Sequence, residues 1–212
     1  MKRAWLLMVP IMVSLVVAVS LLAADGPRLF YSKSFPGSTP AYVEITLSQN
    51  GDVAYREAPD EDNPIKFRLQ EMETREIFDL VEKAGSFKRS LESPAKVAFM
   101  GAKTFRLEDG ADKSEVKFNY TQDAAAQALA DWFERMAESA GRRIDLERAA
   151  KYDKLGVVQS LLELQISLDK KRIVGAEQFL PMLDRISNNE TYMHTARTRA
   201  AEIASTIRNA KP

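Results

Sequence analysis

The sequence contains no cysteine, and this absence excludes several kinds of chemistry. Disulfide bonds, lipid attachment through an N-terminal cysteine, and zinc sites built on thiolates all need that side chain. His194 is the only histidine, so one chain cannot assemble a zinc site of the usual Cys/His kinds. A Ser-His-Asp triad would have to use this same residue, and no serine has a recognisable nucleophile context. We therefore expect His194 to be a surface or interface residue.

An excess of one sign of charge is missing as well. The chain has 30 basic residues (Lys and Arg) and 30 acidic residues (Asp and Glu). A chain with balanced charge does not attract nucleic acid over long distances, so no nucleic-acid partner is predicted. Glycine-rich phosphate loops, metalloprotease motifs and calcium-loop spacings are also lacking. The sequence predicts no cofactor, no metal site and no catalytic residue.

One long run without charge stands at the start of the chain. Lys2 and Arg3 precede an uncharged stretch from Ala4 to Ala24. The apolar part of a signal peptide is typically about 7 to 15 residues long, and about 20 residues span a bilayer. Small residues near the end of the stretch favour cleavage. We predict a signal peptide or signal anchor over residues 1–24, and an extracytoplasmic location, periplasmic or secreted, for the rest. Membrane contact is expected only through this segment, if it is not cleaved.

Alternating apolar residues predict an antiparallel sheet of four to six strands. Between Ala41 and Ser48, apolar residues occupy every second position, which is the period of a half-buried strand. Asn50-Gly51 then favours a tight hairpin into the next strand. The same alternation marks further strands at residues 53–55, 65–69, 104–108 and 115–120, and a short strand is expected at residues 29–34.

Helical periodicity appears within this region and continues after it. Helices are predicted over residues 71–84, 123–140 with an end near Gly141, and 142–171. The last of these carries two adjacent apolar stripes, so it needs neighbours on two sides. The stripes are Leu155, Val158, Leu162 and Ile166, and Val157, Leu161, Leu164 and Leu168. Residues 176–187 and 191–208 are expected to form a helical hairpin, with Pro181 causing a kink or a late start.

These patterns together indicate an α+β fold. A small antiparallel sheet is covered on one face by helices 71–84 and 123–140, and a C-terminal helical layer with an αα-hairpin follows. Residues 25–141 are predicted to form the sheet domain, and residues 142–212 a helical region packed on it. Separate folding of the second part would expose its wide apolar arc, so we expect one cooperative unit.

The outward face of the predicted sheet is a candidate binding surface. It carries five cations, which an anionic partner such as a lipid headgroup or an acidic protein would fit: Arg56, Lys66, Arg68, Arg106 and Lys117. The alternative is an ordinary solvated sheet face with cross-strand charge pairs, each contributing about 0.2 to 1 kcal/mol.

The sequence therefore predicts an exported, non-catalytic envelope protein that acts as a binding or assembly module for a protein or cell-envelope partner. Two alternatives stay open. One is a hydrolase of envelope polymers, which would need two carboxyl groups about 5 to 10 Å apart in a cleft. The other is a membrane-tethered subunit of a larger complex.

Overall fold

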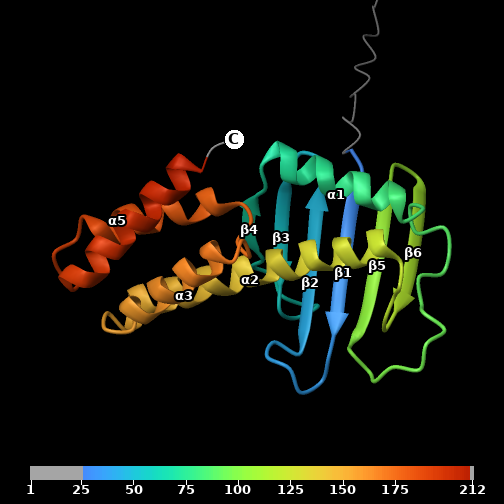
Figure 1. The fold of residues 1–212 in the computed structure, drawn as a ribbon, viewed down its shortest axis with the longest axis horizontal. Helices are drawn as coiled ribbons and strands as arrows, with labels where there is room; N and C mark the ends of the chain where they lie inside the picture. Colours follow the sequence, from blue (N-terminus) through green and yellow to red (C-terminus); the bar gives the residue numbers. More distant parts are fainter. Residues whose placement is uncertain (1–25, 211–212) are drawn as a thin grey trace, which may run out of the picture.

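The computed structural model describes residues 26–210, so the predicted export segment lies outside the described range. The fold is α+β, with one six-stranded antiparallel sheet in the order β4-β3-β2-β1-β5-β6 (Figure 1). The strands are β1 (Arg28–Ser34), β2 (Tyr42–Ser48), β3 (Asp52–Arg56), β4 (Ile65–Arg68), β5 (Ala102–Asp109) and β6 (Asp112–Phe118). Between residues 26 and 210, no helix has the length and apolar character needed to cross a bilayer.

The predicted alternation sets the register of the sheet. Ile45 of β2 lies opposite Tyr31 of β1 and Tyr55 of β3, and all three side chains are buried on the same face. The Asn50-Gly51 hairpin between β2 and β3 requires glycine, because Gly51 has a φ of +89°. A Cβ at this position would also lie 2.9 Å from the carbonyl oxygen of Leu69. The turn therefore fixes which side chains of β3 point inward.

Two helices cover the apolar face of the sheet, as predicted (Figure 1). They are α1 (Glu71–Lys83) and α2 (Ala124–Tyr152). In the centre of this core, the ring of Phe133 on α2 stacks on Tyr31 with centroids 4.6 Å apart. Ile77 and Val81 of α1 are buried beside the same strands. Within the described residues, the other face of the sheet has no helix over it.

The predicted end of the second helix at Gly141 is wrong. Helix α2 is 29 residues long and runs through Gly141 to Tyr152. An added Cβ at Gly141 would meet nothing within 4 Å, so this glycine allows no unusually close approach. A single glycine in a helix costs only about 1 kcal/mol, and burial of Ala140 and Leu146 on either side of it outweighs that cost. The break comes later, where the Asp153 carboxylate accepts a hydrogen bond from the Gly156 backbone at 3.0 Å.

The remaining helices build a second core around the last turns of α2. They are α3 (Val157–Asp169), a 3₁₀ turn (Ala176–Phe179), α4 (Leu180–Ser187) and α5 (His194–Asn209). Pro181 lies in the first turn of α4, which confirms the predicted late start. The helical hairpin is confirmed as well, and His194 is exposed at the start of α5.

Side chains of α2 also make polar contacts with the segment before the 3₁₀ turn and with the edge of the sheet. The buried Ser139 hydroxyl accepts a hydrogen bond from the Val174 backbone at 2.9 Å and donates one to the Arg135 carbonyl at 2.8 Å. Arg143 donates to the Lys66 carbonyl at the free edge of β4, at 2.9 Å. The predicted division between residues 141 and 142 falls inside α2, and the cooperative folding of the two parts as one unit stays a prediction.

Asp123 supplies a test of how α2 begins. Its carboxylate accepts a hydrogen bond from the Ala126 backbone at 2.8 Å and pairs with Arg89. These contacts, the Ala126 hydrogen bond first, lower the pKa of Asp123. We expect Asp123→Ala to lower the free energy of unfolding by about 1 kcal/mol at pH 7. The carboxylate stabilises the fold fully above its unfolded-state pKa of about 4 and loses this effect as the pH falls through the lower folded-state value.

Urea unfolding at pH 7 and at pH 2 measures this difference. The difference in the free energy of unfolding between wild type and Asp123→Ala should be smaller at pH 2 than at pH 7. Asp123→Asn is the matched control, because asparagine caps a helix without titrating. An equal difference in unfolding free energy between wild type and Asp123→Ala at both pH values would contradict this role of Asp123 as a helix cap.

Candidate functional site

The five predicted cations lie on the uncovered face of the sheet, but in two groups, one on β3 and β4 and one on β5 and β6, with β2 and β1 between them. Most of them have carboxylate partners on the same face: Arg56 pairs with Glu44 at 3.2 Å, Arg68 with Asp52 at 2.8 Å, Arg106 with Glu108 at 2.9 Å, and Lys117 with Glu115 at 3.6 Å. Of the five, Lys66 alone has no side-chain partner within residues 26–210.

Arg106 is the most constrained of these cations. Its guanidinium lies 3.9 Å from the ring centroid of Phe30 and also reaches Glu115 at 3.5 Å. The positive charge of Arg106 is already compensated by two carboxylates and an aromatic ring, so it attracts an anionic ligand only weakly. The face therefore resembles a solvated sheet surface with cross-strand pairs. Binding of an anionic partner here stays a prediction.

A cavity of about 390 Å³ between the β3–β4 connection and α2 gathers carboxylates. Glu57 accepts a hydrogen bond from the Tyr55 hydroxyl at 2.9 Å, and Glu61 accepts one from the Glu57 backbone at 2.9 Å. Glu147 pairs with Arg143 at 2.8 Å. Each carboxylate in this cavity thus has a protein partner. Across the described part of the chain, no cluster of three or more His, Asp or Glu side chains is arranged to hold a metal ion.

The loop before β5 exposes apolar side chains at Val97, Phe99 and Met100. Lys103 of β5 anchors this loop. Its ammonium group donates hydrogen bonds to the Met100 carbonyl at 3.2 Å and to the Asn119 carbonyl at 2.9 Å. Burial lowers the pKa of Lys103. The Phe99 ring lies edge-on to Phe35 of the β1–β2 loop, with centroids 5.9 Å apart. Lys103 therefore has a structural role in holding the loop.

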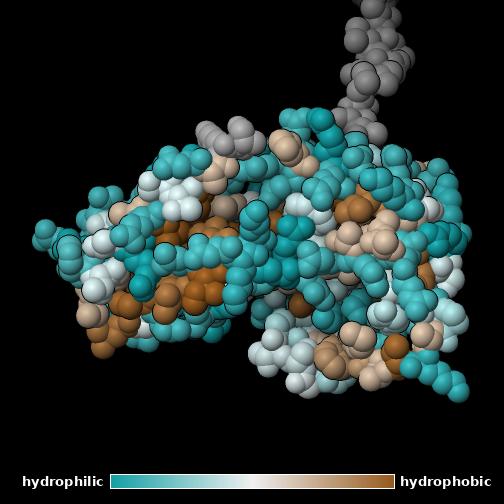
Figure 2. Space-filling view, viewed as in Figure 1, coloured by the Kyte–Doolittle hydropathy of each residue, from teal (hydrophilic) through white to brown (hydrophobic). Residues whose placement is uncertain are grey.

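A second group of exposed apolar side chains lies on α3 and just before it. Of its two predicted stripes, Val157, Leu161 and Leu164 are buried against the second core. The other stripe consists of Leu155, just before the helix, and Val158, Leu162 and Ile166; we call it the α3 stripe. Leu155 is 73% exposed and Ile166 is 42% exposed, while Val158 and Leu162 are half-buried. Figure 2 shows apolar side chains gathered over this part of the helical layer.

Within the described chain, α3 contacts two other helices, α2 and α5. Val158 of the stripe is partly buried against the second core. Leu155 and Ile166, at the two ends of the stripe, stay exposed. Exposed apolar surface of this kind commonly marks an interaction site.

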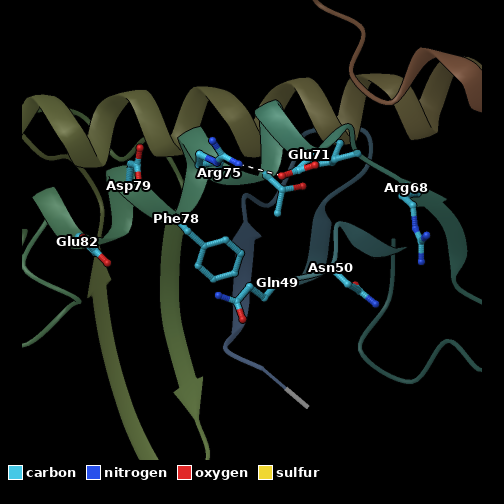
Figure 3. A pocket seen from close by; sticks show the side chains of 10 residues that line it. Gln49, Asn50, Arg68, Glu71, Arg75, Phe78, Asp79 and Glu82 are labelled. Atoms are coloured by element: carbon cyan, nitrogen blue, oxygen red, sulfur yellow. Dashed lines mark hydrogen bonds and ion pairs between the residues drawn. The ribbon is translucent and has the colours of Figure 1, made fainter. Parts of the chain in front are cut away.

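A hollow of about 580 Å³ lies between α1 and the β2–β3 turn; we call it the α1 groove. Glu71, Arg75, Phe78 and Glu82 line it from α1, and Gln49, Asn50, Arg68 and Leu69 line the opposite side. The close view in Figure 3 shows the Phe78 ring directed from the helix toward Gln49. The Glu71 carboxylate pairs with Arg75 at 2.8 Å. No pattern in the sequence indicates this groove, because its walls come from separate segments of the chain.

Comparison with protein-family models finds no match, and comparison with curated proteins finds none either. Function must therefore be inferred from the geometry of this chain alone.

The exposure of the α3 stripe can be tested by a pair of substitutions. We expect Leu155→Ser to change the free energy of unfolding by less than about 0.5 kcal/mol, as is usual for surface positions. Leu161→Ser, a matched change on the buried side of the same helix, should cost about 2 to 5 kcal/mol. Urea unfolding of the two variants measures this contrast. Similar losses for both would mean that the stripe is part of the core.

Proposed function

We propose that this protein is an exported, non-catalytic binding or assembly module, and that it binds an amphipathic helix of another protein on the α3 stripe. The observation that carries the proposal is the exposure of the stripe on a helix whose opposite side is fully packed. The contact would cover Leu155 and Ile166, the two exposed side chains of the stripe.

The spacing of the stripe favours a helical partner. Leu155, Val158, Leu162 and Ile166 follow one another at three or four residues, which makes one ridge along the helix. At about 1.5 Å per residue the ridge is roughly 16 Å long, so about three turns of a partner helix would cover it. Burying a leucine or isoleucine fully contributes about 1.5 to 3 kcal/mol. Only Leu155 and Ile166 start out exposed, so the contact is of modest size, as expected within a larger assembly.

The location follows from the export segment. We propose that residues 1–24 direct the chain out of the cytoplasm, and that their retention would make the protein a tethered subunit. Residue 26 joins β1 at the sheet, whereas the α3 stripe lies on the helical layer beyond β4 (Figure 1). A tether at residue 26 would therefore leave the stripe accessible.

A binding role is preferred to hydrolysis of envelope polymers. The cavity that gathers Glu57, Glu61 and Glu147 uses each carboxylate in a contact within the protein. A hydrolase needs one carboxyl as a proton donor and a second as a base or nucleophile. The two ends of the α3 stripe, Leu155 and Ile166, are by contrast exposed and open to a partner.

Photo-crosslinking in the native cell tests the proposal. A photoreactive residue at Leu155 should form an adduct with one protein, and the crosslinked peptide of that protein should carry apolar residues at helical spacing. The same residue at Ser205, which is exposed on α5, is the matched control and should not form the adduct.

Ile166→Asp, combined with the photoreactive residue at Leu155, should abolish the adduct, because the partner helix would then have to bury a charge at the other end of the apolar contact. Adducts only with lipid, or the same adduct from Ser205, would count against the proposal. Mass spectrometry of the mature N-terminus separates a cleaved from a tethered protein.

A further inference from the structure

We infer that the α1 groove is a second binding surface, separate from the α3 stripe, and that it receives a basic side chain, lysine or arginine, from a segment of a partner protein. The volume of about 580 Å³ is within the range of about 300 to 1,000 Å³ that is common for ligand sites. The groove is thus large enough for one long side chain and part of its backbone.

The charges that remain free in the groove are negative. Arg75 is neutralised by Glu71 at 2.8 Å, and Arg68 by Asp52 at 2.8 Å. Asp79 and Glu82 also line the groove and are exposed. Within residues 26–210 neither of these two carboxylates has a hydrogen bond or an ion pair. A cation entering the groove could therefore pair with these carboxylates without breaking an existing ion pair.

The surrounding helix surface adds to this negative potential. The exposed side chains of α1 include four acids and two bases: Glu71, Glu76, Asp79 and Glu82, with Arg75 and Lys83. An acidic surface of this kind raises the local concentration of cationic groups and disfavours anionic ones. Charge complementarity thus selects a basic partner for this groove.

The apolar part of the groove selects a cation on a hydrocarbon stem. The half-buried Phe78 ring is directed into the hollow (Figure 3), and Leu69 also lines it. Lysine and arginine bury their methylene stems on apolar surface, and their charged ends are attracted to aromatic rings. A bare metal ion would gain nothing from Phe78 and would need more ligands than two carboxylates.

The experiment measures binding of short fluorescein-labelled peptides by anisotropy. Three peptides share one glycine-rich sequence and differ at two positions, which carry arginine, lysine or glutamate. We expect the arginine and lysine peptides to bind the wild-type protein, and the glutamate peptide not to bind.

Asp79→Asn combined with Glu82→Gln should weaken binding of the basic peptides about fivefold or more, the effect expected for two partly screened ion pairs. Glu76→Gln is the matched control. It removes the same charge from the same helix outside the groove and should change the affinity less than about twofold. Phe78→Leu keeps the bulk of the side chain but removes the ring, and should weaken binding about two- to fivefold.

Three outcomes would overturn the inference. The first is no binding of either basic peptide, and the second is an equal loss in Glu76→Gln, which would show non-specific attraction. The third is full competition by spermidine at the same concentration as the peptide, which would assign the groove to free polyamines instead. If the double variant does not fold, Asp79→Asn and Glu82→Gln are tested singly. None of these substitutions touches the α3 stripe, so the test of the proposed function is independent of this one.

Discussion

Burial of one continuous helix on two cores is the constraint on which the rest of the structure depends. The first half of α2 packs Phe133 against Tyr31 on the sheet, and the last turns pack Leu146 into the second core. A helix is stiff over this length, so the position of the helical layer follows from how α2 crosses the sheet (Figure 1). Ser139 and Arg143, both on α2, add hydrogen bonds to Val174 and to the edge of β4. The free edge of β4 is thereby covered, which protects it from pairing with another strand.

This arrangement also decides which surfaces stay open. The sheet has one apolar face, and α1 and α2 cover it. Its other face balances its charges internally, as the pairs of Arg56 with Glu44 and Arg68 with Asp52 illustrate. In the helical layer, α2 and α5 pack against α3, yet Leu155 and Ile166 at the ends of the α3 stripe remain exposed. The α1 groove arises for a different reason, because α1 and the β2–β3 turn approach without filling the space between them. These two surfaces, one apolar and one acidic, are the ones on which we propose that partners bind.

Much of the fold could be predicted from the sequence, since strand and helix periods were both clear. The alternation of Val43, Ile45 and Leu47 defined a strand and its buried side, and Asn50-Gly51 defined the following turn. The helix end predicted at Gly141 was wrong, because local helix propensity does not show how residues on either side of a glycine pack. Here that packing stabilises the helix on both sides of Gly141. The prediction that the five cations face outward was correct. Their ion pairs could not be predicted, because those pairs depend on the register between strands. The α3 stripe was visible as a pattern, whereas its exposure depends on how many helices are available to cover it. The α1 groove required tertiary structure.

The absence of cysteine makes the central claim, that the α3 stripe is open in the folded chain and covered by a partner in the cell, directly measurable. A single cysteine introduced as Ile166→Cys can be labelled with a maleimide in the purified protein and in the intact native envelope. Rapid labelling of the purified protein, together with strong protection in the envelope, is the result expected. Slow labelling of the purified protein would mean that the chain covers the stripe itself, and equally rapid labelling in both settings would mean that no partner binds there.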